Sequence, residues 1–127
     1  MKPTPAERDA LFKAFARALF KCDMDALYEV VSPRFIWRYH DGVSSEIVLT
    51  GREAILGHLE HNKTRYSMVR FHDVVYHHVD DVSFMTFGVS EILRSTGEQR
   101  EQRGIERYTF EHGKIASKDV YRKLVGC

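Results

Sequence analysis

Two ionisable residues, Glu106 and Lys118, lie in neighbouring stretches that alternate between apolar and polar side chains. A turn signal at Glu111-His112-Gly113 separates the stretches and predicts a hairpin of two β-strands. Alternation places Glu106 on the face of Tyr108, and Lys118 on the face of Val120. Because a charge on the apolar side of a sheet must be compensated, we expect a pocket floor with a general acid/base pair. The same pattern also fits a structural ion pair, or a Lys118 that extends into solvent.

Two further residues could take part in proton transfer. His58 falls in a predicted helix, in line with Ile55 and Leu59, which are expected to face inward. The pKa of an unperturbed histidine lies close to neutrality, which suits a proton carrier, although a helix-surface histidine without a role fits equally well. Tyr39 ends an alternating segment and could donate its hydroxyl hydrogen to a carbonyl oxygen, or simply lie at the rim of the pocket.

An apolar cavity with a few convergent polar groups is the general form of a small-molecule site. Many of the residues expected around such a cavity will simply form the core. The seven histidines do not show a zinc-site spacing, and the sequence has no glycine-rich phosphate loop, so we expect neither a metal nor a cofactor. The predicted lining residues are Phe15, Leu19, Phe35, Trp37, Leu59, Met85, Phe87, Tyr108 and Val120.

Length and composition predict one globular domain that spans residues 1–127, with 43% hydrophobic and 29% charged residues. A formal net charge of +1 gives no electrostatic reason to expect nucleic acid or an acidic membrane surface as a partner. The apolar runs are too short to cross a bilayer, and the N-terminal segment lacks a signal-peptide core. Cys22 and Cys127 form no disulfide framework, so we expect a cytoplasmic protein.

Three helices are predicted in the first half of the chain. Thr4, Pro5 and Glu7 form a capping-box start for a helix with a wide apolar stripe. Asp23 begins a short second helix, which ends before Ser32-Pro33. A second capping-box pattern at Thr50-Gly51-Arg52-Glu53 predicts a third helix that continues to about Thr64. The apolar stripe of the first helix comprises Leu11, Phe12, Phe15, Ala18, Leu19, Phe20 and Cys22.

Strand-like segments surround the third helix and fill the second half of the chain. Asp41-Gly42 predicts a turn after the first strand. Helices followed by a meander of strands indicate an α+β fold: a strongly curved antiparallel sheet, wrapped as a cone around the three helices and enclosing a cavity. The predicted strands are residues 34–40, a short edge strand at 47–49, and 68–76, 83–94, 99–110 and 114–124.

In this order of elements the chain resembles the nuclear transport factor 2-like superfamily, with its SnoaL-like and ketosteroid-isomerase-like branches. The resemblance rests on residues 22–27 (CDMDAL), 50–55 (TGREAI) and 107–115 (RYTFEHGKI), and it covers nearly the whole chain. It implies a conical α+β barrel, a pocket inside the cone, and a dimer. These motifs mark caps, turns and core positions, so they indicate the fold and not the chemistry.

Ketosteroid isomerases carry a tyrosine on the first helix, an aspartate base at the end of the first strand and a second acid on a later strand. Aligned from Asp23, these positions fall on Phe15, Tyr39 and the neighbourhood of Glu106. Phe15 has no hydroxyl and Tyr39 is not a carboxylate, so the resemblance does not extend to ketosteroid isomerase activity.

These observations lead to two functional hypotheses. The first is a cofactor-independent SnoaL-like enzyme that isomerises, cyclises, dehydrates or hydrates a hydrophobic carbonyl compound. Glu106 would move the proton, Lys118 or Tyr39 would stabilise the oxyanion, and His58 would assist. The second is a non-catalytic binding or accessory domain that uses the same pocket.

A homodimer is also expected, through the outer face of the sheet. The residues predicted on that face are more apolar than a fully solvated surface requires. They are Ile105, Thr109, Ile115, Ser117 and Tyr121, together with Arg103 and Arg107.

Overall fold

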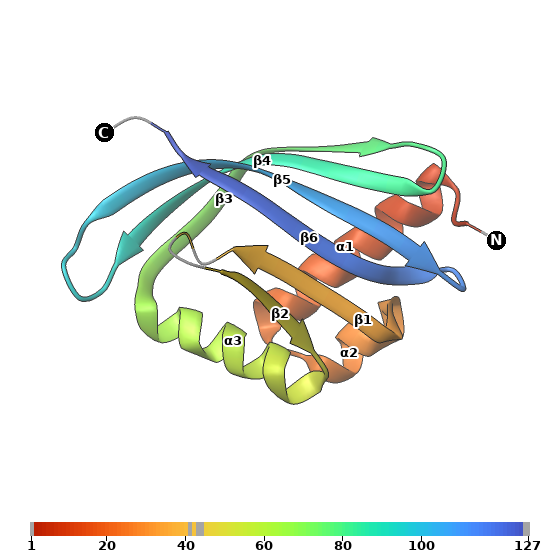
Figure 1. Ribbon diagram of the computed structural model, residues 1–127, viewed down its shortest axis with the longest axis horizontal. Coiled ribbons are helices and arrows are strands. Elements are labelled where there is room, and N and C mark those ends of the chain that lie inside the picture. Colours follow the sequence, from red (N-terminus) through yellow and green to blue (C-terminus); the bar gives the residue numbers. More distant parts are fainter. Residues whose placement is uncertain (1, 41, 43–44, 126–127) are drawn as a thin grey trace.

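The computed structural model describes residues 2–40, 42 and 45–125 of the chain. The chain forms three helices and a six-stranded sheet (Figure 1). Two helices come before the first strand, and the third lies between the second and third strands. The helices are α1 (Pro5–Lys21), α2 (Met24–Val30) and α3 (Arg52–Arg65). The strands are β1 (Val31–His40), β2 (Glu46–Thr50), β3 (Tyr66–His78), β4 (Val82–Leu93), β5 (Gln99–Glu111) and β6 (Lys114–Leu124). Every predicted element is present, and the α+β class is confirmed.

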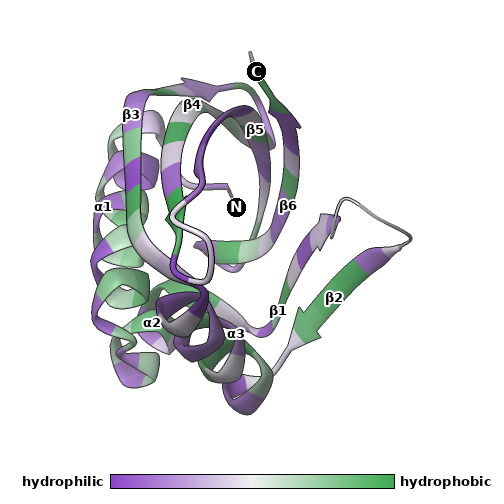
Figure 2. Cartoon of the chain, turned by 90° about the vertical axis from the view of Figure 1, so that its left-hand side faces the viewer, coloured by the Kyte–Doolittle hydropathy of each residue, from purple (hydrophilic) through white to green (hydrophobic). Residues whose placement is uncertain are grey.

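The sheet is curved but does not close, and its strand order is β2-β1-β6-β5-β4-β3. Figure 2 shows β3 to β6 arching over the helices, with α1 beside β3 and with α2 and α3 at the base of the arch. The sheet is not antiparallel throughout, because β1 pairs with β6 in parallel. A parallel pair requires a long crossover, and here most of the chain separates the two strands.

Local sequence sets two of the helix starts as predicted. The Thr4 side chain accepts a hydrogen bond from the backbone of Glu7, whose carboxylate accepts one from the backbone of Thr4 in return. Asp23 caps α2 through the backbone N–H of Ala26. The capping box predicted at Thr50 is wrong. Thr50 is the last residue of β2, and Gly51 with φ 86° is the N-cap of α3 without a side-chain hydrogen bond.

The core lies between the concave face of the sheet and one stripe of α1. The helix buries Arg8, Phe12, Phe15 and Ala18. The predicted stripe was too wide, since the Phe20 side chain is 83% exposed. Phe20 lies near the C-terminal end of α1, on the side that the sheet does not cover.

One irregularity in the β5–β6 pair changes which side chains face inward. Phe110 pairs with Ile115, whereas Thr109 pairs with Ser117, so Ala116 is an extra residue on β6. Such a bulge shifts the alternation by one position. Ile115 is therefore fully buried, and its predicted place on the outer face is wrong. Beyond the bulge, Lys118 faces inward.

Two sequence-based expectations fall on residues outside the described part of the chain. Cys127 is one of them, and Asp41 of the predicted turn is the other. Cys22 is a free, partly buried cysteine at the C-cap of α1. Within the described residues, none of the helices combines the length and the apolar character that a membrane crossing requires.

Candidate functional site

The structure brings Glu106 and Lys118 together on the concave face of the sheet. They are diagonal neighbours, since Lys118 pairs with Tyr108 and Glu106 pairs with Val120. Lys118 Nζ lies 3.7 Å from Glu106 Oε1. The whole residues are 7% and 1% exposed, respectively, so the pair is buried.

Aromatic side chains surround the ammonium group. Lys118 Nζ lies 4.0 Å from the centre of the Trp37 ring and 5.5 Å from that of Phe15. A ring face attracts a cation, most strongly when water is excluded. Burial lowers the pKa of Lys118, the carboxylate of Glu106 opposes that shift, and the positive charge of Arg122 adds to it. The pKa of this ammonium group is therefore set by opposing effects, namely burial and Arg122 against the charge of Glu106.

A tyrosine contacts the same carboxylate oxygen of Glu106 as Lys118 does. The hydroxyl of Tyr108 donates a hydrogen bond to Glu106 Oε1. Burial and the nearby Glu106 charge raise the pKa of Tyr108 well above its usual range, so this hydroxyl keeps its proton. Glu106 therefore has both a cation and a hydroxyl donor on one carboxylate oxygen.

His58 lies on α3 and faces the same wall as Trp37. Its ring is 5.0 Å from the Trp37 ring, and its Nδ1 is 3.3 Å from the hydroxyl of Tyr39. The amide of Asn62 lies 3.2 Å from Nε2. Burial lowers the pKa of His58 to about 4, with a further contribution from the charge of Lys118. His58 is therefore neutral at physiological pH, and it can accept a proton without first losing one.

A cavity of about 960 Å³ opens beside these groups. The candidate catalytic residues Tyr39, His58 and Lys118 line it, whereas Glu106 does not. The other lining residues come mainly from β1, β2, α3, β5 and β6, and they include Trp37, Ile47, Asn62, Tyr66, Glu91, Arg100, Gln102, Val120 and Arg122.

Only two of the predicted lining residues, Trp37 and Val120, lie on this cavity. Five of the others are buried core residues: Phe15, Phe35, Met85, Phe87 and Tyr108. Leu19 and Leu59 are partly buried and pack against that core. Periodicity predicts which face a side chain takes, but it does not separate the wall of a cavity from the solid core beneath it.

A cluster around Glu91 was not predicted. Glu91 is 3% exposed, and the Arg100 and Arg122 side chains lie 3.6 and 3.4 Å from its oxygens. Gln102 Nε2 donates to Glu91 Oε1 at 2.8 Å. Arg100 and Gln102 occupy the same strand face as Glu106, so alternation alone could have placed them inward. The pairing of Glu91 with Arg100 depends on the β4–β5 register.

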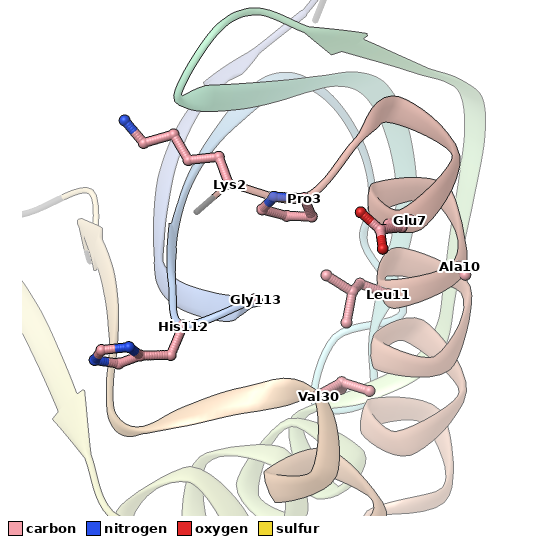
Figure 3. Close-up of a pocket in the computed structure, with 8 residues that line it drawn as sticks. All are labelled: Lys2, Pro3, Glu7, Ala10, Leu11, Val30, His112 and Gly113. Carbon is pink, nitrogen blue, oxygen red and sulfur yellow. The ribbon is translucent and has the colours of Figure 1, made fainter.

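A second hollow, of about 620 Å³, lies beside the N-terminal half of α1 (Figure 3). Lys2 and Pro3, the α1 residues Glu7, Ala10 and Leu11, Val30 of α2, and the His112-Gly113 turn line it. Its carboxylate, Glu7, is already engaged in the helix cap. The hollow contains none of the buried ionisable groups, which makes the cavity beside Lys118 the candidate site.

Comparison with known families gives the same architecture. The sequence model of the SnoaL-like domain matches residues 12–118. The chain belongs to the SnoaL-like domain family. A comparison with curated protein sequences finds no significant match.

Solved structures of this SnoaL-like domain's fold are numerous but distant in sequence. An NTF2-like protein from Burkholderia xenovorans aligns with a TM-score of 0.80 at 15% identity, over 94% of this chain and 92% of its own. A Xanthomonas campestris protein proposed to be a polyketide cyclase has a TM-score of 0.72 at 17% identity, over 91% of this chain and 90% of its own. A protein with a ketosteroid isomerase-like fold from Catenulispora acidiphila, in complex with trimethylamine, has a TM-score of 0.72 at 16% identity, over 94% of this chain and 86% of its own. At these identities the likeness establishes the fold.

Proposed function

We propose that this SnoaL-like domain is a small cofactor-independent enzyme that performs acid/base chemistry on a hydrophobic carbonyl compound. The observation that carries the proposal is the buried Lys118 ammonium, which lines the cavity beside a neutral histidine. A cation held in a water-poor site is suited to stabilise the negative charge that develops on a carbonyl oxygen. The aromatic wall formed by Trp37 suits the apolar part of the substrate.

In this proposal the carbonyl oxygen binds next to Lys118, and the proton on the adjacent carbon faces His58. His58 takes that proton on Nε2, in place of its hydrogen bond with Asn62. The resulting enolate oxygen is stabilised by the Lys118 ammonium, with the Tyr39 hydroxyl close by. Return of the proton from His58 to a different carbon completes an isomerisation. Transfer of that proton to a β-hydroxyl group, which then leaves as water, completes a dehydration.

Glu106 has a different part from the one first expected of it. It does not line the cavity, and its carboxylate contacts Lys118 and Tyr108. We therefore assign it as a positioning residue that keeps the ammonium charged and in place. Proton transfer then falls to His58, and stabilisation of the enolate oxygen falls to Lys118.

The experiment is hydrogen–deuterium exchange of a cyclic enone, followed by NMR in deuterated buffer. We expect the protein to catalyse exchange at the carbon next to the carbonyl. His58→Gln should abolish exchange but keep binding, which the fluorescence of Trp37, the single tryptophan, can report. Exchange that His58→Gln leaves unchanged would contradict the assigned base.

The alternative is a non-catalytic ligand-binding or accessory domain. It is favoured by the engagement of Glu106 by two neighbours away from the cavity surface. Recovery of a bound carbonyl compound with no exchange and no chemical change would support it. The same binding and exchange measurements therefore separate the two functions.

We also propose that the protein forms a homodimer through the outer face of the sheet. Ile105 and Tyr121 pair across β5 and β6 on that face and are 46% and 59% exposed. Light scattering should give twice the chain mass of 14.8 kDa, and Ile105→Glu should reduce it to the monomer. A wild-type monomer at micromolar concentration would overturn this proposal.

A further inference from the structure

The mouth of the cavity holds more positive than negative charge. Glu91 is the buried carboxylate there, and both Arg100 and Arg122 lie within 4 Å of it. Gln102, the third neighbour of Glu91, is neutral and donates a hydrogen bond to it. One carboxylate thus faces two guanidinium groups, which leaves one positive charge in surplus within this cluster. The deeper pair of Glu106 and Lys118 has no such surplus.

Arg100 also has an unused hydrogen-bond donor. A guanidinium group carries five N–H donors and no acceptor. Arg100 Nε is buried and has no hydrogen-bond partner within the part of the chain that the structure describes. Its Nη2 donates to the Tyr66 hydroxyl at 3.3 Å. A buried donor without an acceptor is costly, so the unpartnered Nε is an unfavourable feature of this cluster.

Arg122 is held in place by aromatic rings. Its guanidinium carbon lies 5.6 Å from the centre of the Phe71 ring and 5.4 Å from that of Phe87. The Phe87 ring fits over Gly104, where an added Cβ atom would come within 2.4 Å of it. Restricted in this way, Arg122 loses less entropy on binding an anion than a free surface arginine would.

The arginine cluster and the candidate catalytic groups face one cavity. Lys118, Val120 and Arg122 are alternate residues on one face of β6, so about 13 Å of strand separates the first from the last. The charge of Arg122 acts on both His58 and Lys118 and lowers the pKa of each. Val120 and Trp37 supply apolar surface in the same cavity. A molecule bound at Arg122 therefore extends over an apolar surface toward Lys118.

We propose that the substrate is an amphipathic carboxylate, whose anionic group binds Arg122 and Arg100 while its apolar body covers Val120 and Trp37. The reacting carbonyl group then lies at the opposite end, beside Lys118 and His58. The inference deepens the proposed function and rests on it for the reacting end. The binding end rests on the charge surplus, the packing of Arg122 against two rings, and the shared cavity.

The test compares two probes of the same shape, naphthalene-2-carboxylate and the neutral naphthalene-2-carboxamide. Quenching of Trp37 fluorescence measures the affinity of each for the full chain. We expect the carboxylate to bind at least about tenfold more tightly, a difference of 1.4 kcal/mol. Arg122→Gln should remove most of that preference. Arg103→Gln makes the same charge change on the exposed outer face and should keep it.

Glu91→Gln provides a second variant, because Arg122→Gln also leaves Glu91 with one arginine fewer and could unfold the protein. Removing the internal competitor for the arginines should tighten carboxylate binding and leave carboxamide binding unchanged. Equal affinities of the two probes in the wild type would overturn the anion site but not the proposed function. Loss of the preference in Arg103→Gln as well would overturn it by showing a general charge effect. Failure of both probes to bind would count against the inference and against the cavity as a ligand site.

Discussion

The cavity is bordered by two ionic clusters that differ in charge balance and in exposure. The deep cluster pairs one carboxylate, Glu106, with one ammonium, Lys118, and aromatic rings exclude water from it. The cluster at the mouth surrounds Glu91 with two arginines whose side chains are 24% and 31% exposed. Burial makes an unpaired charge costly, so the deep cluster must balance internally. Partial hydration lets the outer cluster keep a surplus charge for a ligand.

The largest effect is expected from breaking the deep pair. Lys118→Met leaves Glu106 as a buried carboxylate without its cation, and it should lower the free energy of unfolding by about 3–5 kcal/mol. The double variant Glu106→Gln with Lys118→Met should recover part of that loss, because the two residues are coupled. Urea denaturation of both single variants and the double variant measures this.

Lys123→Met is the matched control, since Lys123 is an exposed lysine on the same strand. It should stay within about 0.5 kcal/mol of the wild type. If the losses of the two single deep-pair variants simply add in the double variant, the pair carries no coupling and the balance argument is wrong.

Breaking the outer cluster should cost less. Glu91→Gln leaves Arg100 and Arg122 facing each other without their carboxylate, but water reaches both side chains. We expect a loss of about 2 kcal/mol, below the range for a fully buried pair. Adding Arg122→Gln should restore part of it. Thermal and urea unfolding measure both effects, and a loss as large as that of Lys118→Met would remove the distinction between the clusters.

A smaller effect is expected from His58, which lies beside the deep cluster, when the pH is changed. His58 has a folded-state pKa of about 4, below its ordinary value of 6.5. Between those values the unfolded chain binds a proton that the folded chain does not, so stability falls as the pH drops from about 6.5 to 4. Because the ring is partly exposed, we expect about 1–2 kcal/mol.

His58→Gln is the variant that isolates this contribution, since it should show a flatter stability curve between pH 6.5 and 4. His72 has a raised pKa through its hydrogen bonds to Asp73 and Glu101. The contribution of His72 to the free energy of unfolding is present below pH 6.5 and is lost as the pH rises above that value. A rise in pH therefore reduces the stabilisation from His72, whereas it removes the destabilisation from His58. Identical curves for the wild type and His58→Gln would exclude a lowered folded-state pKa for His58.

The smallest effect is expected at the surface. Lys2 Nζ lies 3.4 Å from Asp81 Oδ2, which is closer than the 3.7 Å of the deep pair. Both surface side chains are more than half exposed, so Asp81→Asn should change stability by less than about 0.5 kcal/mol. A change above 1 kcal/mol in urea denaturation would show that distance and not burial governs these pairs.

The sequence by itself determined the elements and most of their faces. The Thr4 and Asp23 caps, the hairpin turn at His112-Gly113 and the alternation that turns Glu106 inward are all local signals. Hydrogen bonds and side-chain alternation act over a few residues, so a linear pattern carries them. The resemblance in three short segments was enough to predict the fold.

Only the tertiary structure decided what each inward side chain meets. The bulge at Ala116 buried Ile115, and the β4–β5 register placed Glu91 opposite Arg100. Lys118 lies on the cavity wall, whereas Glu106 is buried away from it. These outcomes depend on contacts between residues far apart in the chain. One residue of register turns a side chain to the opposite face, and no local pattern fixes that choice.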